Sequence, residues 1–121
     1  MVYTKFYCKP SAGSIHMTIR GHADSAPKGH DLICASVTML AYTLAQAVEF
    51  LYQQGALKKK PRIRLEEGDV TIIATPRDEY FAQVLQSYWV AQCGCYVLAR
   101  NYPQFVTLAP IKYEKSPSLS R

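Results

Sequence analysis

The chain has 121 residues, of which 49% are hydrophobic, and this length and composition fit one globular domain. Its N-terminus alternates like a strand and lacks the apolar stretch of a secretory signal, so we expect a cytoplasmic protein with reduced cysteines. The formal net charge of +5 favours an acidic partner such as RNA or a ribonucleoprotein surface. Basic residues at helix ends also complement the helix dipole. Nucleic acid contact is therefore compatible with the composition but not required by it.

The first part of the chain predicts a β-hairpin. Residues Val2–Cys8 read as one strand, and apolar and polar residues alternate again over 15–19, after a turn at 10–14. Gly21 and His22 follow the second strand, where a glycine lets the backbone turn or approach a ligand closely. A polar loop then leads to the next element, and the glycines that flank it are either hinges or plain turn residues.

A long apolar helix is predicted next. Asp31 is a good N-cap and Gly55 a C-terminal stop, so the helix extends to about Gln54. Polar residues interrupt it, which favours a buried helix over a membrane span. A sheet covers only one side of a helix, yet several apolar residues lie off the main stripe, so we predict cover by a second helix or by another subunit, and hence a homodimer. The stripe contains Ile33, Val37, Leu40, Leu44, Ala47 and Leu51, and the residues off it are Leu32, Met39, Tyr42 and Phe50.

The rest of the chain predicts two strands, a helix and a short strand. The strands are 63–65 and 70–75, joined by a tight turn, and Pro76 begins a helix that ends at Tyr102-Pro103. Gly94 weakens this helix midway, its apolar stripe includes Phe81, Val84, Leu85, Tyr88 and Trp89, and a strand follows over 105–109. The order β-β-α-β-β-α-β predicts an α+β two-layer fold, with an antiparallel or mixed sheet and two helices. We expect one domain over 1–110 and a mobile tail over 111–121.

The four cysteines do not predict a metal site. Cys93-Gly94-Cys95 is a C-x-C pair, whereas structural zinc sites space their ligands C-x2–4-C and need four of them. These cysteines are better explained as small side chains in a packed helix. A zinc deaminase is excluded because its H-x-E and P-C-x-x-C segments are missing. We therefore expect neither a metal nor a cofactor.

One histidine and one cysteine form a candidate catalytic pair. His22 and Cys34 are twelve positions apart, and Cys34 opens the long helix. A helix N-terminus presents free N–H groups and a partial positive charge, which favour a nucleophilic thiolate. A nearby imidazole can take the thiol proton and later protonate a leaving amine. The pair indicates a small cysteine peptidase, although most free cysteines are buried and do no chemistry.

Four neighbours of Cys34 are candidates for supporting or substrate-binding roles. Asp31 either caps the helix or orients His22 or a substrate group. With Asp31 as the cap, Cys34 is the third helical residue, so the N–H groups of Cys34 and Ala35 are candidates for an oxyanion hole. Thr38 lies one turn further on the same helix face, with Ser36 nearby.

His16 and His30 are alternative bases. His16 lies on a strand face several residues back, which makes it the poorer candidate, and His30 is adjacent to Asp31. His22 remains the favoured base.

The block Gly21-His22-Ala23, a loop, then Asp31-Leu32-Ile33-Cys34-Ala35 resembles the ribosomal-processing cysteine protease family, called Prp. The resemblance covers nearly the whole chain, including the turn at 66–69 and the late Tyr102-Pro103. It implies removal of an N-terminal extension from a bacterial large-subunit ribosomal protein, whose mature tail reaches toward the peptidyl-transferase centre. It also implies Cys34 as nucleophile, His22 as base, a dimer, and a loop that orders on the substrate.

One position departs from the family pattern, and one alternative function stays open. The family usually has Ser where this chain has Thr38, so the hydroxyl is retained and an extra methyl alters the substrate fit. The alternative is a non-catalytic ribosome- or RNA-associated binding protein, suggested by the net charge and the basic run Lys58–Arg62. That alternative predicts salt-sensitive RNA binding and an unreactive Cys34.

Overall fold

The structure is a computed structural model that describes residues 1–22 and 30–109, with side chains at the start of the long helix described from Leu32 onward. The loop at 23–29 and the predicted tail over 111–121 lie outside the described residues.

Five strands form one mixed sheet. In chain order they are β1 (Val2–Lys9), β2 (Ser14–Arg20), β3 (Arg62–Glu66), β4 (Asp69–Ala74) and β5 (Val106–Leu108). Their order across the sheet is β3-β4-β2-β1-β5, and every neighbouring pair is antiparallel except the parallel pair of β1 and β5. The predicted β-hairpin is the pair β1–β2, and the central strand β2 lies between β1 and β4.

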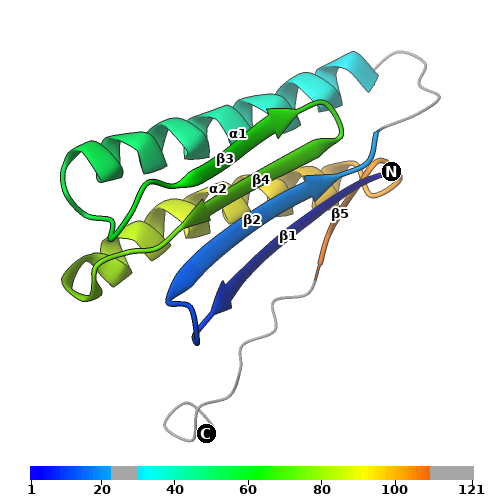
Figure 1. The fold of residues 1–121 in the computed structure, drawn as a ribbon. Helices are drawn as coiled ribbons and strands as arrows, with labels where there is room; N and C mark the ends of the chain where they lie inside the picture. Colours follow the sequence, from blue (N-terminus) through cyan, green and yellow to red (C-terminus); the bar gives the residue numbers. More distant parts are fainter. Residues whose placement is uncertain (23–29, 110–121) are drawn as a thin grey trace, which may run out of the picture.

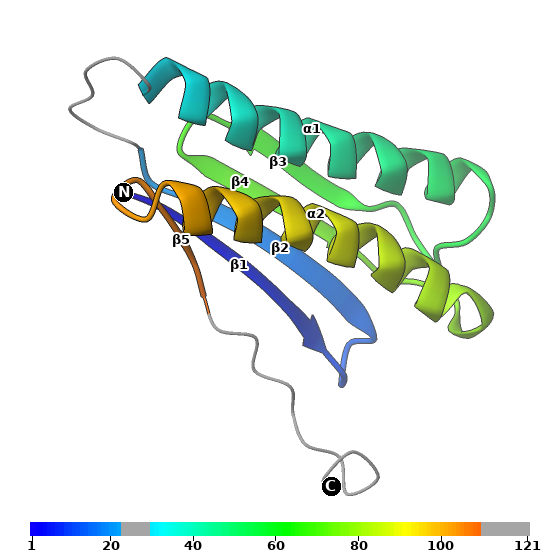
Figure 2. The same cartoon turned by 180° about the vertical axis from the view of Figure 1, so that it is seen from behind.

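Two long helices cover one face of this sheet. They are α1 (His30–Gln53) and α2 (Phe81–Asn101), and a short 3-10 helix, η1 (Asp78–Tyr80), precedes α2. Figures 1 and 2 show opposite sides of the molecule, with the sheet in front of the helices in the first and the helices in front of the sheet in the second. The predicted two-layer α+β fold and its order β-β-α-β-β-α-β are confirmed.

The core lies between the helix layer and the sheet. Alternation along the strands points Ile15, Met17 and Ile19 of β2 toward the helices, where they are buried. The Tyr88 hydroxyl of α2 donates to the backbone carbonyl of Ile72 in β4 at 3.1 Å, which satisfies a buried polar group. The buried residues of α1 are Ile33, Val37, Ala41, Leu44, Ala45, Val48 and Leu51, so the predicted stripe is confirmed except at the half-buried Leu40 and Ala47.

The second helix begins later than predicted. Pro76 is buried and forms an isolated β-bridge with Leu57, and the Arg77 N–H donates to the Ala56 carbonyl at 2.9 Å. These contacts hold the chain extended past Pro76, so the long helix begins only at Phe81. Its predicted end before Pro103 is confirmed. Two members of its predicted stripe point outward, because Leu85 is 38% and Trp89 52% exposed.

The two helices approach each other closely at Gly94. The helix α2 is continuous through this residue, so Gly94 does not interrupt it. A Cβ added at Gly94 would overlap the Leu40 side chain of α1. The glycine therefore allows the α1–α2 contact that covers part of the apolar surface of α1.

The outer surface of the helix layer exposes many apolar side chains. The segment Leu32–Gln53 is long and apolar enough to cross a membrane by length and composition alone, yet its inner side packs on the sheet as the core helix. The residues predicted to lie off its stripe are exposed, and α2 adds further exposed apolar side chains. These exposed residues are Leu32, Met39, Tyr42 and Phe50 of α1, and Leu85, Trp89, Val90, Tyr96 and Val97 of α2.

Candidate active site

The backbone before and at His22 is held on two sides. Gly21 has φ +95°, and its N–H donates to the Gly68 carbonyl at 3.1 Å. A Cβ at Gly21 would overlap the Met1 carbonyl oxygen, so this position needs glycine. The N-terminal amino group of Met1 donates to the His22 carbonyl at 2.6 Å. The end of β2 thereby fixes where the His22 side chain begins.

The β3–β4 turn supports the imidazole of His22. Gly68 in this turn has φ +71°, and a Cβ added there would overlap the His22 ring, so the ring lies directly against the glycine. The Nδ1 atom of His22 is 3.9 Å from Oε1 of Glu67. This distance is too long for a hydrogen bond, so Glu67 acts on a protonated imidazole through charge. His22 and Glu67 side chains are 50% and 92% exposed, so solvent screens the pair.

Cys34 and His22 line the same cavity. Cys34 lies near the start of α1, is partly exposed, and packs against the core. The cavity has a volume of about 240 Å³. Its lining also includes Thr38 and Tyr42 of α1 and Leu65 of β3, so it lies between the helix and the strand ends next to the β3–β4 turn. The predicted catalytic pair therefore comes together from two elements that are separated in sequence.

The predicted supporting residues differ in their relation to the cavity. Gly21 and Thr38 line the cavity with the catalytic pair. Ala35 is exposed and Ser36 donates its hydroxyl to the Leu32 carbonyl at 2.8 Å, and neither belongs to the described lining. Asp31 lies within the helix, and its side chain is outside the described part of the chain.

The start of α1 changes two predictions. The helix already includes His30, so Asp31 is in its first turn and is not the residue before it. Cys34 is consequently the fifth helical residue, beyond the four whose N–H groups lack helical partners. The N–H groups of Cys34 and Ala35 are therefore committed to the helix, and the predicted oxyanion hole does not form from them. A first-turn carboxylate still complements the helix dipole.

His16 is on the other face of the sheet. It is buried, its Nε2 and the Ser14 hydroxyl are 2.7 Å apart, and its ring stacks on Tyr7 with centroids 4.6 Å apart. Burial lowers its pKa, and the charges of Lys9 and Arg62 lower it further. The structure therefore separates His16 from the cavity, while the side chain of the other alternative base, His30, is outside the described residues.

Sequence reasoning missed the role of Glu67 and Gly68. The turn at 66–69 is predicted, but nothing in the sequence connects it to His22. The signal that makes the connection is strand pairing, because Arg20 of β2 lies opposite Asp69 of β4 and the next residues along β2 reach the turn. A glycine in a turn that lies next to the end of the strand before His22 could therefore have indicated this contact.

Among the described side chains, those of residues 1–22 and 32–109, no three His, Cys, Asp or Glu are grouped to hold a metal ion. Cys93 and Cys95 lie on α2, as predicted. Burial raises the pKa of the Cys95 thiol to about 11, so this thiol stays protonated at neutral pH.

A thiol and an imidazole that line one cavity are the two groups that a cysteine peptidase needs. Residues 1–107 match the family model described as cysteine protease Prp, and the chain belongs to this family. No curated protein sequence matches the chain significantly.

Solved structures share the fold. The essential ribosomal processing protease Prp from S. aureus, in complex with a substrate peptide, aligns with a TM-score of 0.63 at 15% identity, over 90% of this chain and 98% of that one. The protein SMU.848 from Streptococcus mutans aligns with a TM-score of 0.63 at 25% identity, over 89% and 91%. The S. aureus protease with a covalently linked product peptide gives 0.62 at 16% identity, over 89% and 97%.

Proposed function

We propose that this cysteine peptidase removes the N-terminal extension of a bacterial large-subunit ribosomal protein, with Cys34 as nucleophile and His22 as general base. The observation that carries the proposal is the cavity shared by these two side chains. Membership of the Prp family supports the ribosomal substrate, and a related protease has been solved with a substrate peptide. Membership of a cysteine protease family favours catalysis over the non-catalytic alternative, which the net charge and the basic run Lys58–Arg62 suggested.

The reaction proceeds through an acyl-enzyme. His22 takes the proton from the Cys34 thiol, and the sulfur attacks the carbonyl carbon of the scissile peptide bond. The protonated imidazole gives its proton to the leaving amine as the carbon–nitrogen bond breaks, which leaves a thioester on Cys34. Water then attacks the thioester while His22 takes its proton, and the acid product leaves with the thiol restored. The Glu67 carboxylate lies 3.9 Å from the imidazolium that forms in each half of the cycle, and solvent screens the attraction between them.

We also propose that the enzyme is a homodimer through the outer surface of its helix layer. Contiguous exposed apolar surface on a globular protein usually marks an interface. Between Leu32 and Gln53 the only formally charged residue of α1 is Glu49, and Arg100 is the only one in α2. A second copy of the chain would bury this surface.

The proposed ribosomal substrate also implies a cytoplasmic location, because ribosomal proteins are assembled there.

Cleavage of precursor peptides tests the function. We would incubate the protein with synthetic peptides that span the N-termini of large-subunit ribosomal proteins and identify products by mass spectrometry. The wild type is expected to cut one bond near the N-terminus of one peptide. Cys34→Ala is expected to abolish cleavage, and His22→Ala to lower the rate by about 10²- to 10⁴-fold, the usual contribution of a general base.

Cys8→Ala is the matched control, because Cys8 is an exposed thiol on β1 that does not line the described cavity. It is expected to cleave at the wild-type rate. Cleavage by Cys34→Ala at the wild-type rate would contradict the proposed mechanism. A wild-type protein that cuts none of the precursor peptides would contradict the proposed substrate.

A further inference from the structure

The face of the sheet opposite the helices carries its own ordered set of side chains. It faces the viewer in Figure 1. Because side chains alternate along each strand, the register of β1, β2, β4 and β3 defines which residues stand side by side on this open face. The resulting rows are Lys9–Ser14, then Tyr7–His16–Ile73–Arg62, then Lys5–Thr18–Thr71–Arg64, and finally Tyr3–Arg20–Asp69–Glu66.

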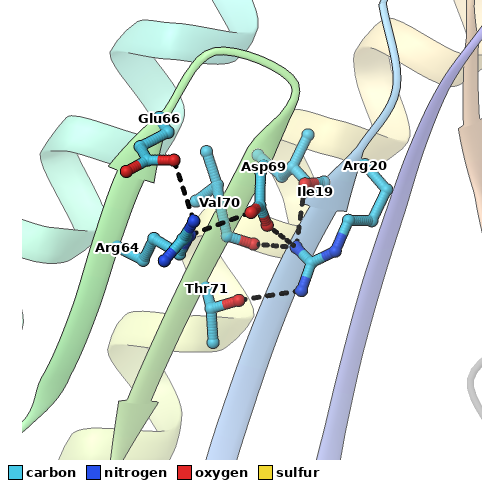
Figure 3. A network of polar contacts seen from close by, with 7 residues as sticks. All are labelled: Ile19, Arg20, Arg64, Glu66, Asp69, Val70 and Thr71. Carbon is cyan, nitrogen blue, oxygen red and sulfur yellow. Dashed lines mark hydrogen bonds and ion pairs between the residues drawn. The ribbon is translucent and has the colours of Figure 1, made fainter.

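The end of the open face next to the β3–β4 turn is neutralised internally. Arg64 donates to Asp69 at 2.8 Å and to Glu66 at 2.9 Å, and Arg20 pairs with Asp69 at 3.3 Å. The Arg20 guanidinium also donates to two backbone carbonyls and to the Thr71 hydroxyl, as Figure 3 shows. Two arginines and two carboxylates thus satisfy one another and leave no net charge in this network.

The rest of the open face stays positive. Lys5, Lys9 and Arg62 are exposed, and within the described residues none of them forms an ion pair with a carboxylate. Glu66 and Asp69 are the only acidic residues in the rows. The buried His16 beside Lys9 and Arg62 adds no negative charge. This basic half of the open face, defined by Lys5, Lys9 and Arg62, is therefore open to an anionic partner.

Aromatic rings accompany the basic groups. Tyr7 stacks on His16, and the Lys5 ammonium lies 4.9 Å from the Tyr7 ring centroid. Tyr3 lies on the same strand and face and is 57% exposed. Basic groups that alternate with flat rings on an open sheet suit a partner that carries both phosphates and bases, since phosphates pair with cations and bases stack on aromatic faces.

We propose that the open face binds single-stranded RNA, with phosphates on Lys9 and Arg62 and a base on the exposed ring of Tyr3. This site goes beyond the proposed peptidase function and does not depend on it, because it lies on the opposite side of the sheet from the helix layer. An acidic peptide offers carboxylates but no bases to stack, and duplex RNA keeps its bases stacked on one another. The combination of charge and rings therefore selects the single strand.

Fluorescence anisotropy with a labelled oligouridylate of about 12 nucleotides tests this site. The double variant Lys9→Gln/Arg62→Gln is expected to weaken binding at least tenfold. Its slope of log affinity against log salt is expected to be smaller by about 1.4, at about 0.7 for each lost phosphate contact. Tyr3→Leu is expected to weaken binding by roughly tenfold through lost stacking.

Two controls match these changes outside the open face. Arg77→Gln/Arg100→Gln removes the same charge, and Tyr80→Leu removes an exposed ring, and both are expected to bind like the wild type. Circular dichroism melting checks that each variant is folded. Equal weakening by the charge variants and their controls would overturn the proposal. So would duplex RNA or oligoglutamate that binds as tightly as the oligouridylate.

Discussion

The position of the His22 imidazole, which we propose as the general base, depends on Gly68. Gly68→Ala would drive a methyl group into the His22 ring, so we expect kcat/KM for peptide cleavage to fall by about 10- to 100-fold, as small misplacements of catalytic groups do. Gly13→Ala is the matched control, because Gly13 has a similar φ of +62° but nothing within 4 Å of an added Cβ. Both variants carry the same backbone strain, so equal losses of activity would contradict the role of Gly68.

The buried His16 should make stability depend on pH. Its pKa is lowered by burial and by Lys9 and Arg62, so the unfolded chain takes up a proton near pH 6.5 before the folded protein does. The free energy of unfolding is therefore expected to be fully retained above about pH 6.5 and to fall as the pH drops below it. His16→Gln removes this contribution. Denaturant unfolding at several pH values should show a flatter profile for His16→Gln, and an unchanged profile would refute the prediction.

At the scale of residues, the sequence indicated which side chains could form the site, but it gave less information about the residues that contact them. His22, Cys34 and Thr38 line one cavity, as their spacing and the resemblance suggested. Ala35 and Ser36 do not, because the Ala35 side chain is exposed and the Ser36 hydroxyl donates to the Leu32 carbonyl. Glu67 and Gly68 could not be assigned from the sequence, because their role arises from a contact across strands.

At the scale of elements, the alternating and helical patterns predicted every strand and both long helices. The differences lie where tertiary contacts outweigh the local pattern. Pro76 has the residue type that begins helices, but its bridge to Leu57 keeps it extended. Gly94 has the residue type that weakens helices, but close packing on Leu40 explains why a glycine stands at this position.

The outer surface of the helices should form the dimer. Met39 and Phe50 are 64% and 53% exposed and lie about three turns apart on α1, so they share one side of the helix. Met39→Gln/Phe50→Gln would remove apolar contacts twice in a symmetric dimer. We therefore expect the dissociation constant of the dimer to rise by at least about 100-fold. Analytical ultracentrifugation over a range of concentrations measures this change.

Tyr3→Gln is the control for the dimer, because it removes an equally exposed apolar side chain from the open sheet face. It is expected to leave the dimer intact. A wild type that sediments as a monomer at all concentrations, or a dimer lost equally in the control, would rule out an interface on the helix layer.

At the scale of the whole molecule, the order of elements could be predicted but the order of strands could not. Local patterns define each hairpin, whereas the pairing of β2 with β4 joins residues about fifty positions apart. That pairing brings the β3–β4 turn to His22 and produces an open face with one neutralised and one basic half. The two faces of a single sheet thereby support two separate sites, a peptidase cavity on the helix side and a basic, aromatic surface opposite.

The most direct test of the central claim is to detect the acyl-enzyme. Protein mixed with a cleavable precursor peptide would be quenched in acid, digested, and analysed by mass spectrometry. We predict a peptide acyl group on Cys34, its mass equal to the N-terminal product less one water, and no adduct in Cys34→Ala. Cleavage with an adduct on another residue, or cleavage by Cys34→Ala at the wild-type rate, would contradict the account.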